Sequence, residues 1–158
     1  MANKSCHFDF YRAGEYSYEQ VFTLMNRLDC NHIEKQDFFR RMVFNIAACN
    51  CDDHVKNFSF LMDKSGLWHL APAYDVCFAY NPAGRWTSAH QMTVNGKTAD
   101  FEKSDFEQCR KIAGLKQSEV DEIIIQVLQA VQNWHNFAEQ SNVRVQMIDS
   151  ISNCFVSL

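Results

Sequence analysis

The chain has 158 residues, about the size of one globular domain, and 47% of them are hydrophobic, so we expect residues 1–158 to form a single domain with a packed core. Its formal net charge of −4 at pH 7 supplies no basic face for a phosphate backbone, so direct nucleic-acid binding is disfavoured. No apolar run approaches the roughly 18 residues of a membrane span, and the first residues lack the apolar stretch of a secretory signal, so we expect no membrane segment.

The first third of the chain predicts an irregular segment followed by two helices. Residues 1–16 are polar and aromatic without a clear period. Ser17 is placed to cap a helix over 18–28, in which apolar residues recur at steps of three and four. The run that starts at Glu34 predicts a second, strongly apolar helix, whose broad face is formed by Phe38, Phe39, Met42, Val43, Ile46 and Ala47.

Two short strands and a long loop are predicted in the middle of the chain. The turn formers at 63–66 separate β-prone runs at 58–62 and 67–76, which favours a β-hairpin. Residues 81–98 contain proline and glycines and few periodic apolar residues, so we expect a functional loop with one small strand at 92–94. Some side chains of this loop could face phosphate or substrate, although solvation or core packing is the simpler interpretation: Arg85, Trp86 and Lys97.

The last third predicts a helical bundle over residues 104–156. Ser104 starts a run with the spacing of a capping box, and Gly114 supplies a stop. Ser118 is placed to cap a long helix, and a final helix is expected from about 143 to 155. The buried stripe of the long helix should consist of Val120, Ile124, Val127, Leu128, Val131 and Trp134. The predicted fold is therefore mainly α with a small β-hairpin.

Three oxygen-bearing side chains follow the apolar second helix in the order that phosphoryl transfer requires. Asp52 and Asn57 stand five residues apart in D-D-H-V-K-N, and Asp75 follows the hairpin in P-A-Y-D-V. Phosphoryl transfer needs a carboxylate to accept the proton of the acceptor hydroxyl, and an amide oxygen and a second carboxylate to bind Mg²⁺ on the nucleotide phosphates. Protein kinases have the same Asp-to-Asn offset and a second metal-binding Asp. We therefore expect a catalytic loop and a metal-binding hairpin within 50–76.

These residues resemble a known family. N-C-D-D-H-V-K-N-F-S-F-L followed by L-A-P-A-Y-D-V is similar to the N-x-D-x-H-x-K-N and P-x-Y/F-D motifs of HipA-type serine/threonine kinases, the toxin halves of bacterial toxin–antitoxin pairs. The resemblance implies that Asp52 is the catalytic base and that Asn57 and Asp75 bind Mg²⁺. It also implies that His54 and Lys56 support the catalytic loop. The chain would then be the C-terminal helical lobe of a bilobal kinase that transfers the γ-phosphate of ATP.

The resemblance further implies partners and a second lobe. Family members act on aminoacyl-tRNA synthetases or on themselves, and a small DNA-binding antitoxin of the HipB type holds them. A kinase also needs a β-rich N-lobe with a nucleotide-covering loop and a lysine, and no G-x-G-x-x-G or P-loop precedes Asp52. We therefore expect the N-lobe to be missing or to be a separate polypeptide, and the chain alone to lack measurable kinase activity. The alternative is a non-catalytic fragment or pseudokinase that binds a partner protein through its helices.

The cysteines allow one further interpretation. Cys49, Cys51 and His54 form a C-x-C-x-x-H cluster, but structural zinc needs four ligands and no second pair such as C-x-x-C occurs in the sequence. Seven cysteines without a regular framework favour reduced thiols and a cytoplasmic protein.

Three further polar residues are expected to be structural. Asp53 should be solvated or structural rather than catalytic. His69 and His90 are isolated in the sequence, and each is expected to be an ordinary strand or loop residue.

Overall fold

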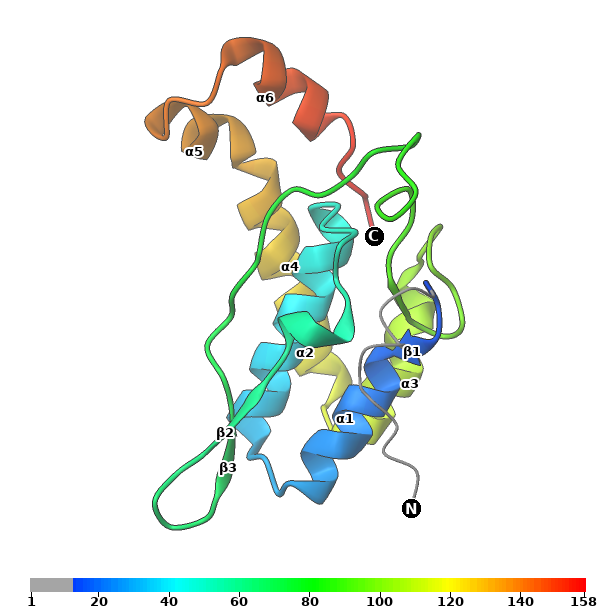
Figure 1. Ribbon diagram of the computed structural model, residues 1–158, viewed down its shortest axis with the longest axis vertical. Coiled ribbons are helices and arrows are strands. Elements are labelled where there is room, and N and C mark those ends of the chain that lie inside the picture. Colours follow the sequence, from blue (N-terminus) through cyan, green and yellow to red (C-terminus); the bar gives the residue numbers. More distant parts are fainter. Residues whose placement is uncertain (1–12) are drawn as a thin grey trace.

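The computed structural model describes residues 13–158, which form a mainly helical fold with two small β-sheets (Figure 1). Its α-helices are α1 (Tyr18–Arg27), α2 (His32–Ala47), α3 (Glu107–Ala113), α4 (Gln117–Gln132), α5 (Trp134–Gln140) and α6 (Val145–Ser152). Its short elements are β1 (Tyr16–Ser17), β2 (Phe60–Met62), β3 (Trp68–Leu70), β4 (Met92–Thr93) and the 3₁₀ helices η2 (Val55–Asn57) and η3 (Lys103–Phe106). Within this range, no helix combines the length and the apolar character that crossing a membrane requires.

Capping boxes start both N-terminal helices. The predicted cap Ser17 accepts a hydrogen bond from the backbone N–H of Gln20, whose side chain accepts one from the N–H of Ser17 in return. The second helix begins at His32 rather than at Glu34, because Asn31 caps it and Glu34 closes the box as the third residue of the helix. The sequence pattern therefore identified this helix but placed its first turn too late.

The predicted caps at Ser104 and Ser118 are wrong. The carboxylate of Asp105 instead accepts the backbone N–H of Glu102 at 2.8 Å, and that of Glu119 accepts the N–H at position 116 at 2.7 Å. Asp105 and Glu119 are therefore the third residues of segments whose N-caps, at positions 102 and 116, lie two residues before the predicted serines. The predicted stop at Gly114 is confirmed, since this residue adopts a left-handed conformation with φ of 71°.

The long C-terminal helix predicted from Ser118 is two helices, with a break at Asn133. After the break, α5 packs against α6, and the indole N–H of Trp134 donates to the carbonyl of Ile148 at 3.0 Å. Trp134 also packs edge-to-face on Phe155. Most of the predicted stripe is buried (Val120, Ile124, Val127 and Val131), while Leu128 and Trp134 are half-buried. The final helix is shorter than predicted and covers Val145–Ser152.

The core lies around α2, which packs most extensively against α4, while α1 packs against α3 (Figure 1). Phe38 of α2 is fully buried and makes edge-to-face contacts with Phe22 and with Phe58, each with ring centroids 5.1 Å apart. Burying one such side chain contributes about 1.5–3 kcal/mol to stability. Because Phe58 directly follows Asn57, this aromatic cluster attaches the predicted catalytic loop to the core.

The hairpin of β2 and β3 is antiparallel, as predicted, and its turn is closed by Asp63. One Asp63 oxygen accepts the backbone N–H groups of Ser65 and Leu67 at 2.8 and 3.0 Å. Glu34 of α2 accepts the N–H of Leu70 at 3.0 Å and thereby joins the hairpin to the helical core.

A second sheet, a parallel pair of β1 and β4, was only half predicted. The small strand expected at 92–94 is present as β4, and its partner is Tyr16–Ser17, which the sequence assigned to an irregular segment and to a cap. Residues 1–12 of that predicted irregular segment lie outside the described residues.

Candidate active site

The predicted catalytic loop, residues 50–57, leaves the end of α2 through a sharp backbone turn. Cys49 adopts a positive φ of 55°, which ends the helix and redirects the chain. The start of the loop then pairs with the segment that follows the hairpin, since Cys51 N–H donates to the carbonyl of Ala79 and Ala79 N–H donates to the carbonyl of Cys49, both at 3.1 Å. Segments that the sequence separates by the whole hairpin are therefore held side by side.

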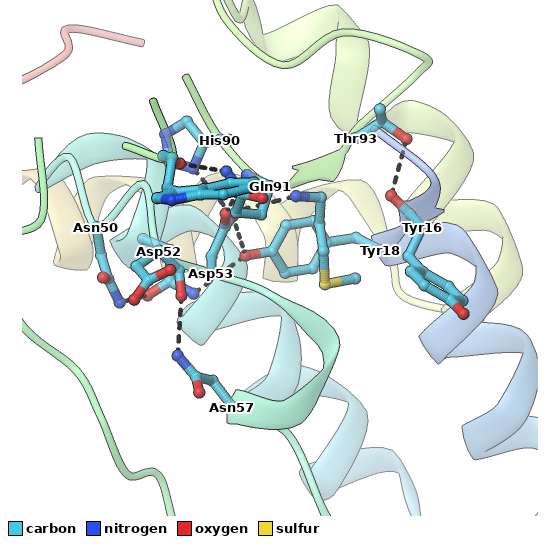
Figure 2. A network of polar contacts seen from close by, with 12 residues as sticks. Tyr16, Tyr18, Asn50, Asp52, Asp53, Asn57, His90, Gln91 and Thr93 are labelled. Carbon is cyan, nitrogen blue, oxygen red and sulfur yellow. Dashed lines mark hydrogen bonds and ion pairs between the residues drawn. The ribbon is translucent and has the colours of Figure 1, made fainter. Parts of the chain in front are cut away.

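Asp52 and Asn57 contact each other directly within this loop. The side-chain nitrogen of Asn57 donates to the backbone carbonyl of Asp52 at 2.8 Å (Figure 2). This contact fixes the amide orientation and leaves its oxygen as an acceptor for a cation. The carboxylate of Asp52 is 44% exposed, so it is accessible to an acceptor hydroxyl.

Asp75 lies close to the catalytic loop. Asn57 and Asp75 both line a pocket of about 10 Å³, roughly the space of one water molecule or ion. Two contacts hold the Asp75 segment against the loop. Asn50 donates its side-chain N–H to the carbonyl of Asp75 at 3.5 Å, and the hydroxyl of Tyr74 donates to the carbonyl of Lys56 at 2.7 Å.

The negative charges of Asp75 and Asp52 both affect the pKa of the Cys77 thiol. Its pKa is raised first by partial burial, then by the negative charge of Asp75, then by that of Asp52. Both carboxylates therefore act on one position. The structure thus places Asn57 against the backbone of Asp52 and on the lining of the same pocket as Asp75.

The two predicted supporting residues differ in position. His54 is half-buried, and its Nε2 lies 3.8 Å from a carboxylate oxygen of Asp52. Lys56 is exposed at the surface of η2, and its backbone carbonyl is the group that anchors Tyr74. His54 is therefore placed to influence the carboxylate of Asp52, whereas Lys56 is placed to meet solvent or a ligand.

Cysteine geometry does not favour the zinc interpretation. The thiol of Cys49 donates to the carbonyl of Cys154 at 2.7 Å, and burial raises the pKa of Cys49 to about 11 and that of Cys51 to about 12. Across residues 13–158, no group of three His, Cys, Asp or Glu side chains is arranged to hold a metal ion.

A buried polar network beneath the loop was not predicted from the sequence. Asp53 is fully buried, and its two oxygens accept hydrogen bonds from the Tyr18 hydroxyl at 2.8 Å, the His90 ring at 2.9 Å and the Gln91 backbone N–H at 2.8 Å (Figure 2). Asp53 is therefore structural, as expected, but it is not solvated. His90 is a loop residue, as predicted, but it is not isolated, because it is buried against this carboxylate.

The network continues from Tyr18 toward Asp75. The hydroxyl of Tyr18 accepts from the Asn45 side chain at 3.0 Å, and Asn45 in turn accepts from the Asn50 side chain at 3.0 Å. Burial first, and then the neighbouring Asp53 carboxylate, raise the pKa of Tyr18 well above its ordinary value. Asn45 could have indicated this network from the sequence, since it is a lone amide on the otherwise apolar buried face of α2.

Comparisons with known proteins identify a family and a relative. A protein-family model described as HipA-like C-terminal domain matches residues 2–135. A curated protein of Haemophilus influenzae named "Putative kinase" is 38% identical over 60 residues, which are 37% of this chain and 18% of that protein. The matched stretch thus spans less than a fifth of the relative's length.

Proposed function

The chain belongs to the family of HipA-like C-terminal domains, and from this membership we propose that it is the catalytic portion of an ATP- and Mg²⁺-dependent serine/threonine protein kinase. The observation that carries the proposal is that the two proposed metal ligands line one pocket. Asn57 and Asp75 both line it, and Asn57 is hydrogen-bonded to the backbone of Asp52. The curated relative named as a kinase supports the same activity class.

The donor set fits a hard cation. Mg²⁺ prefers carboxylate and amide oxygens and commonly takes only one or two protein ligands together with nucleotide phosphates. Asn57 offers its amide oxygen and Asp75 its carboxylate, so these two residues would hold the ion. When bound, Mg²⁺ neutralises charge on the transferred phosphate. The small size of the pocket is consistent with an ion whose remaining ligands come from outside the protein.

The residues of the loop have separate roles in this proposal. The exposed carboxylate of Asp52 accepts the proton of the acceptor serine or threonine hydroxyl as general base. His54 lies beside that carboxylate and supports its orientation. Lys56, exposed on η2, approaches the transferred phosphate or the protein substrate.

The proposal includes a second lobe and partners outside this chain. Residues 13–158 contain only two-stranded sheets, so the β-rich lobe that covers the nucleotide would be supplied by other residues or by a separate polypeptide. As in the HipA-type kinases that the sequence resembles, the protein substrate would be an aminoacyl-tRNA synthetase or the kinase itself, and a HipB-type antitoxin would hold the complex. We place this system in the bacterial cytoplasm.

Phosphoryl transfer tests the proposal. The purified chain is incubated with γ-labelled ATP, Mg²⁺ and the protein substrate, alone and with the β-rich lobe encoded in or next to its reading frame. We expect transfer only with that lobe, and we expect Asp52→Asn to lower the rate by about 10²–10⁴-fold. Asp149→Asn is the control, since that carboxylate is 79% exposed and far along the chain on α6. Transfer that survives Asp52→Asn, or no transfer in the reconstituted protein, would contradict the proposal in favour of a non-catalytic binding module.

A further inference from the structure

Asp53 stands next to the proposed base but points the opposite way. Asp52 exposes its carboxylate, while Asp53 is fully buried and bonded to groups from α1 and from the segment just before β4. Because the two residues share a planar peptide bond, the hydrogen bonds that fix the side chain of Asp53 also restrict the backbone from which the side chain of Asp52 projects. The buried carboxylate therefore restricts where the exposed one points.

The contact extends to the proposed metal ligand. Asn57 is oriented by its hydrogen bond to the backbone carbonyl of Asp52, the residue that precedes Asp53. A shift of the backbone at 52–53 would move this carbonyl and release the Asn57 amide. The same buried network reaches the other proposed ligand, since it ends at Asn50, whose side chain contacts the carbonyl of Asp75.

The segment after Asp75 is also anchored at two points of the loop. Ala79 pairs with the backbone of residues 49 and 51, and His90 and Gln91 bond to Asp53. Residues 80–89 lie between these anchors, and Figure 2 shows His90, Gln91 and Tyr18 gathered around Asp53. Asp53 therefore joins three segments, which are its own loop, the start of α1 and residues 90–91.

We propose that Asp53, held by Tyr18 and His90, is the positioning residue of this site, which sets the backbone at 52–53 and through it the direction of Asp52 and the orientation of the Asn57 amide. The inference rests on the proposed function for the roles of Asp52 and Asn57. Its structural content, that Asp53 controls the contact between Asn57 and Asp52, is independent of catalysis. Supporting groups of this kind typically change metal affinity or activity by about 10–100-fold when removed.

The test observes the Asn57 side-chain amide by NMR in the full chain, without metal or nucleotide. In the unmodified protein, one Nδ2 proton should be shifted and protected from solvent exchange by its bond to the Asp52 carbonyl. In Asp53→Asn, which keeps the size but loses the charge, we expect this signature to be lost and exchange to become about ten-fold faster. Asp105→Asn is the matched control, because Asp105 is also a buried carboxylate with several hydrogen bonds, made to Asn95, Lys97 and Glu102.

The outcomes separate the two proposals. A folded Asp53→Asn variant that keeps the Asn57 signature overturns the positioning role, as does an equal loss in Asp105→Asn. If Asp53→Asn does not fold, Tyr18→Phe and His90→Gln each remove one partner and keep the carboxylate, and an unchanged signature in both overturns it equally. Absence of phosphoryl transfer in the reconstituted protein would refute the kinase proposal while leaving this result intact.

Discussion

The imidazole Nδ1 of His90 lies 2.9 Å from a carboxylate oxygen of Asp53, and both side chains are almost completely shielded from solvent. The ring of His90 is also packed edge-to-face against Phe101. The contact joins residues that are 37 positions apart in the sequence. In the sequence, the whole hairpin, the Asp75 segment and the loop after it lie between these two residues. The geometry of the site therefore depends on long-range packing as well as on the local motif.

The hydroxyl of Tyr18 should stabilise the fold measurably. Tyr18→Phe removes the donor to Asp53 and the acceptor for Asn45, leaving both buried groups short of a partner. We expect the free energy of unfolding in urea to fall by about 1–3 kcal/mol. Tyr80→Phe, at a half-buried position outside this network, serves as control. Equal denaturation midpoints for Tyr18→Phe and the parent protein would show that the buried hydroxyl contributes nothing.

The aromatic cluster around Phe38 should be the most sensitive part of the core. Phe38→Ala removes a fully buried ring that contacts Phe22 and Phe58, and we expect a loss of about 3–5 kcal/mol in the free energy of unfolding. Phe137, which is 49% exposed, provides the comparison. Its replacement by Ala should cost less than about 1 kcal/mol. Similar losses at the two positions would contradict the described core.

Thiol reactivity should follow burial. In a Cys6→Ser background, we expect Cys77 to react with a disulfide reagent before Cys51 and Cys109, because Cys77 is exposed and the other two are buried. Burial raises the pKa of Cys51 to about 12, so its reactive thiolate is scarce at pH 8. Raising the pH should speed labelling of Cys77, whose pKa is itself raised. Mass spectrometry of the peptides would reveal the order, and early labelling of Cys109 would conflict with the structure.

His69 should titrate above its ordinary range. Its ring lies between the carboxylates of Asp63 and Glu34, and hydrogen bonds to Asp63 and then to Glu34 raise its pKa. A raised folded-state pKa stabilises the protein below the unfolded value of about 6.5, and this contribution is lost as pH rises through the folded pKa. NMR titration should show Asp63→Asn lowering the pKa, whereas Asp121→Asn leaves it unchanged. An unperturbed His69 in the parent protein would argue against the hairpin contacts.

Local patterns were sufficient to predict most elements. Apolar spacing identified α1, α2 and the C-terminal helices, and the turn formers at 63–66 identified the hairpin. The caps at Ser104 and Ser118 were wrong because both helical segments have their N-caps two residues earlier, where Asp105 and Glu119 accept the backbone N–H groups of residues 102 and 116. The break at Asn133 could not be read from the apolar stripe, because it depends on where α6 lies.

Sequence spacing also identified Asp52, Asn57 and Asp75 as candidates, and in the structure Asn57 and Asp75 line one pocket while Asn57 is hydrogen-bonded to the backbone of Asp52. The spacing gave no reason to connect Asp53 with His90, since nothing local marks two residues that meet only through tertiary packing. The parallel pairing of Tyr16 with Met92 was unpredictable for the same reason.

We propose that Asn57 and Asp75 hold one metal ion beside Asp52. Mn²⁺ can replace Mg²⁺ at oxygen ligands, and it broadens NMR signals of nearby nuclei. A titration with Mn²⁺ and ATP should broaden the backbone amides of Asn57 and Asp75 together, with one concentration dependence, and Asp75→Asn should weaken the effect at both positions. Broadening of the two amides at different concentrations, or loss at Asp75 alone in the variant, would contradict a shared ion and with it the proposed site.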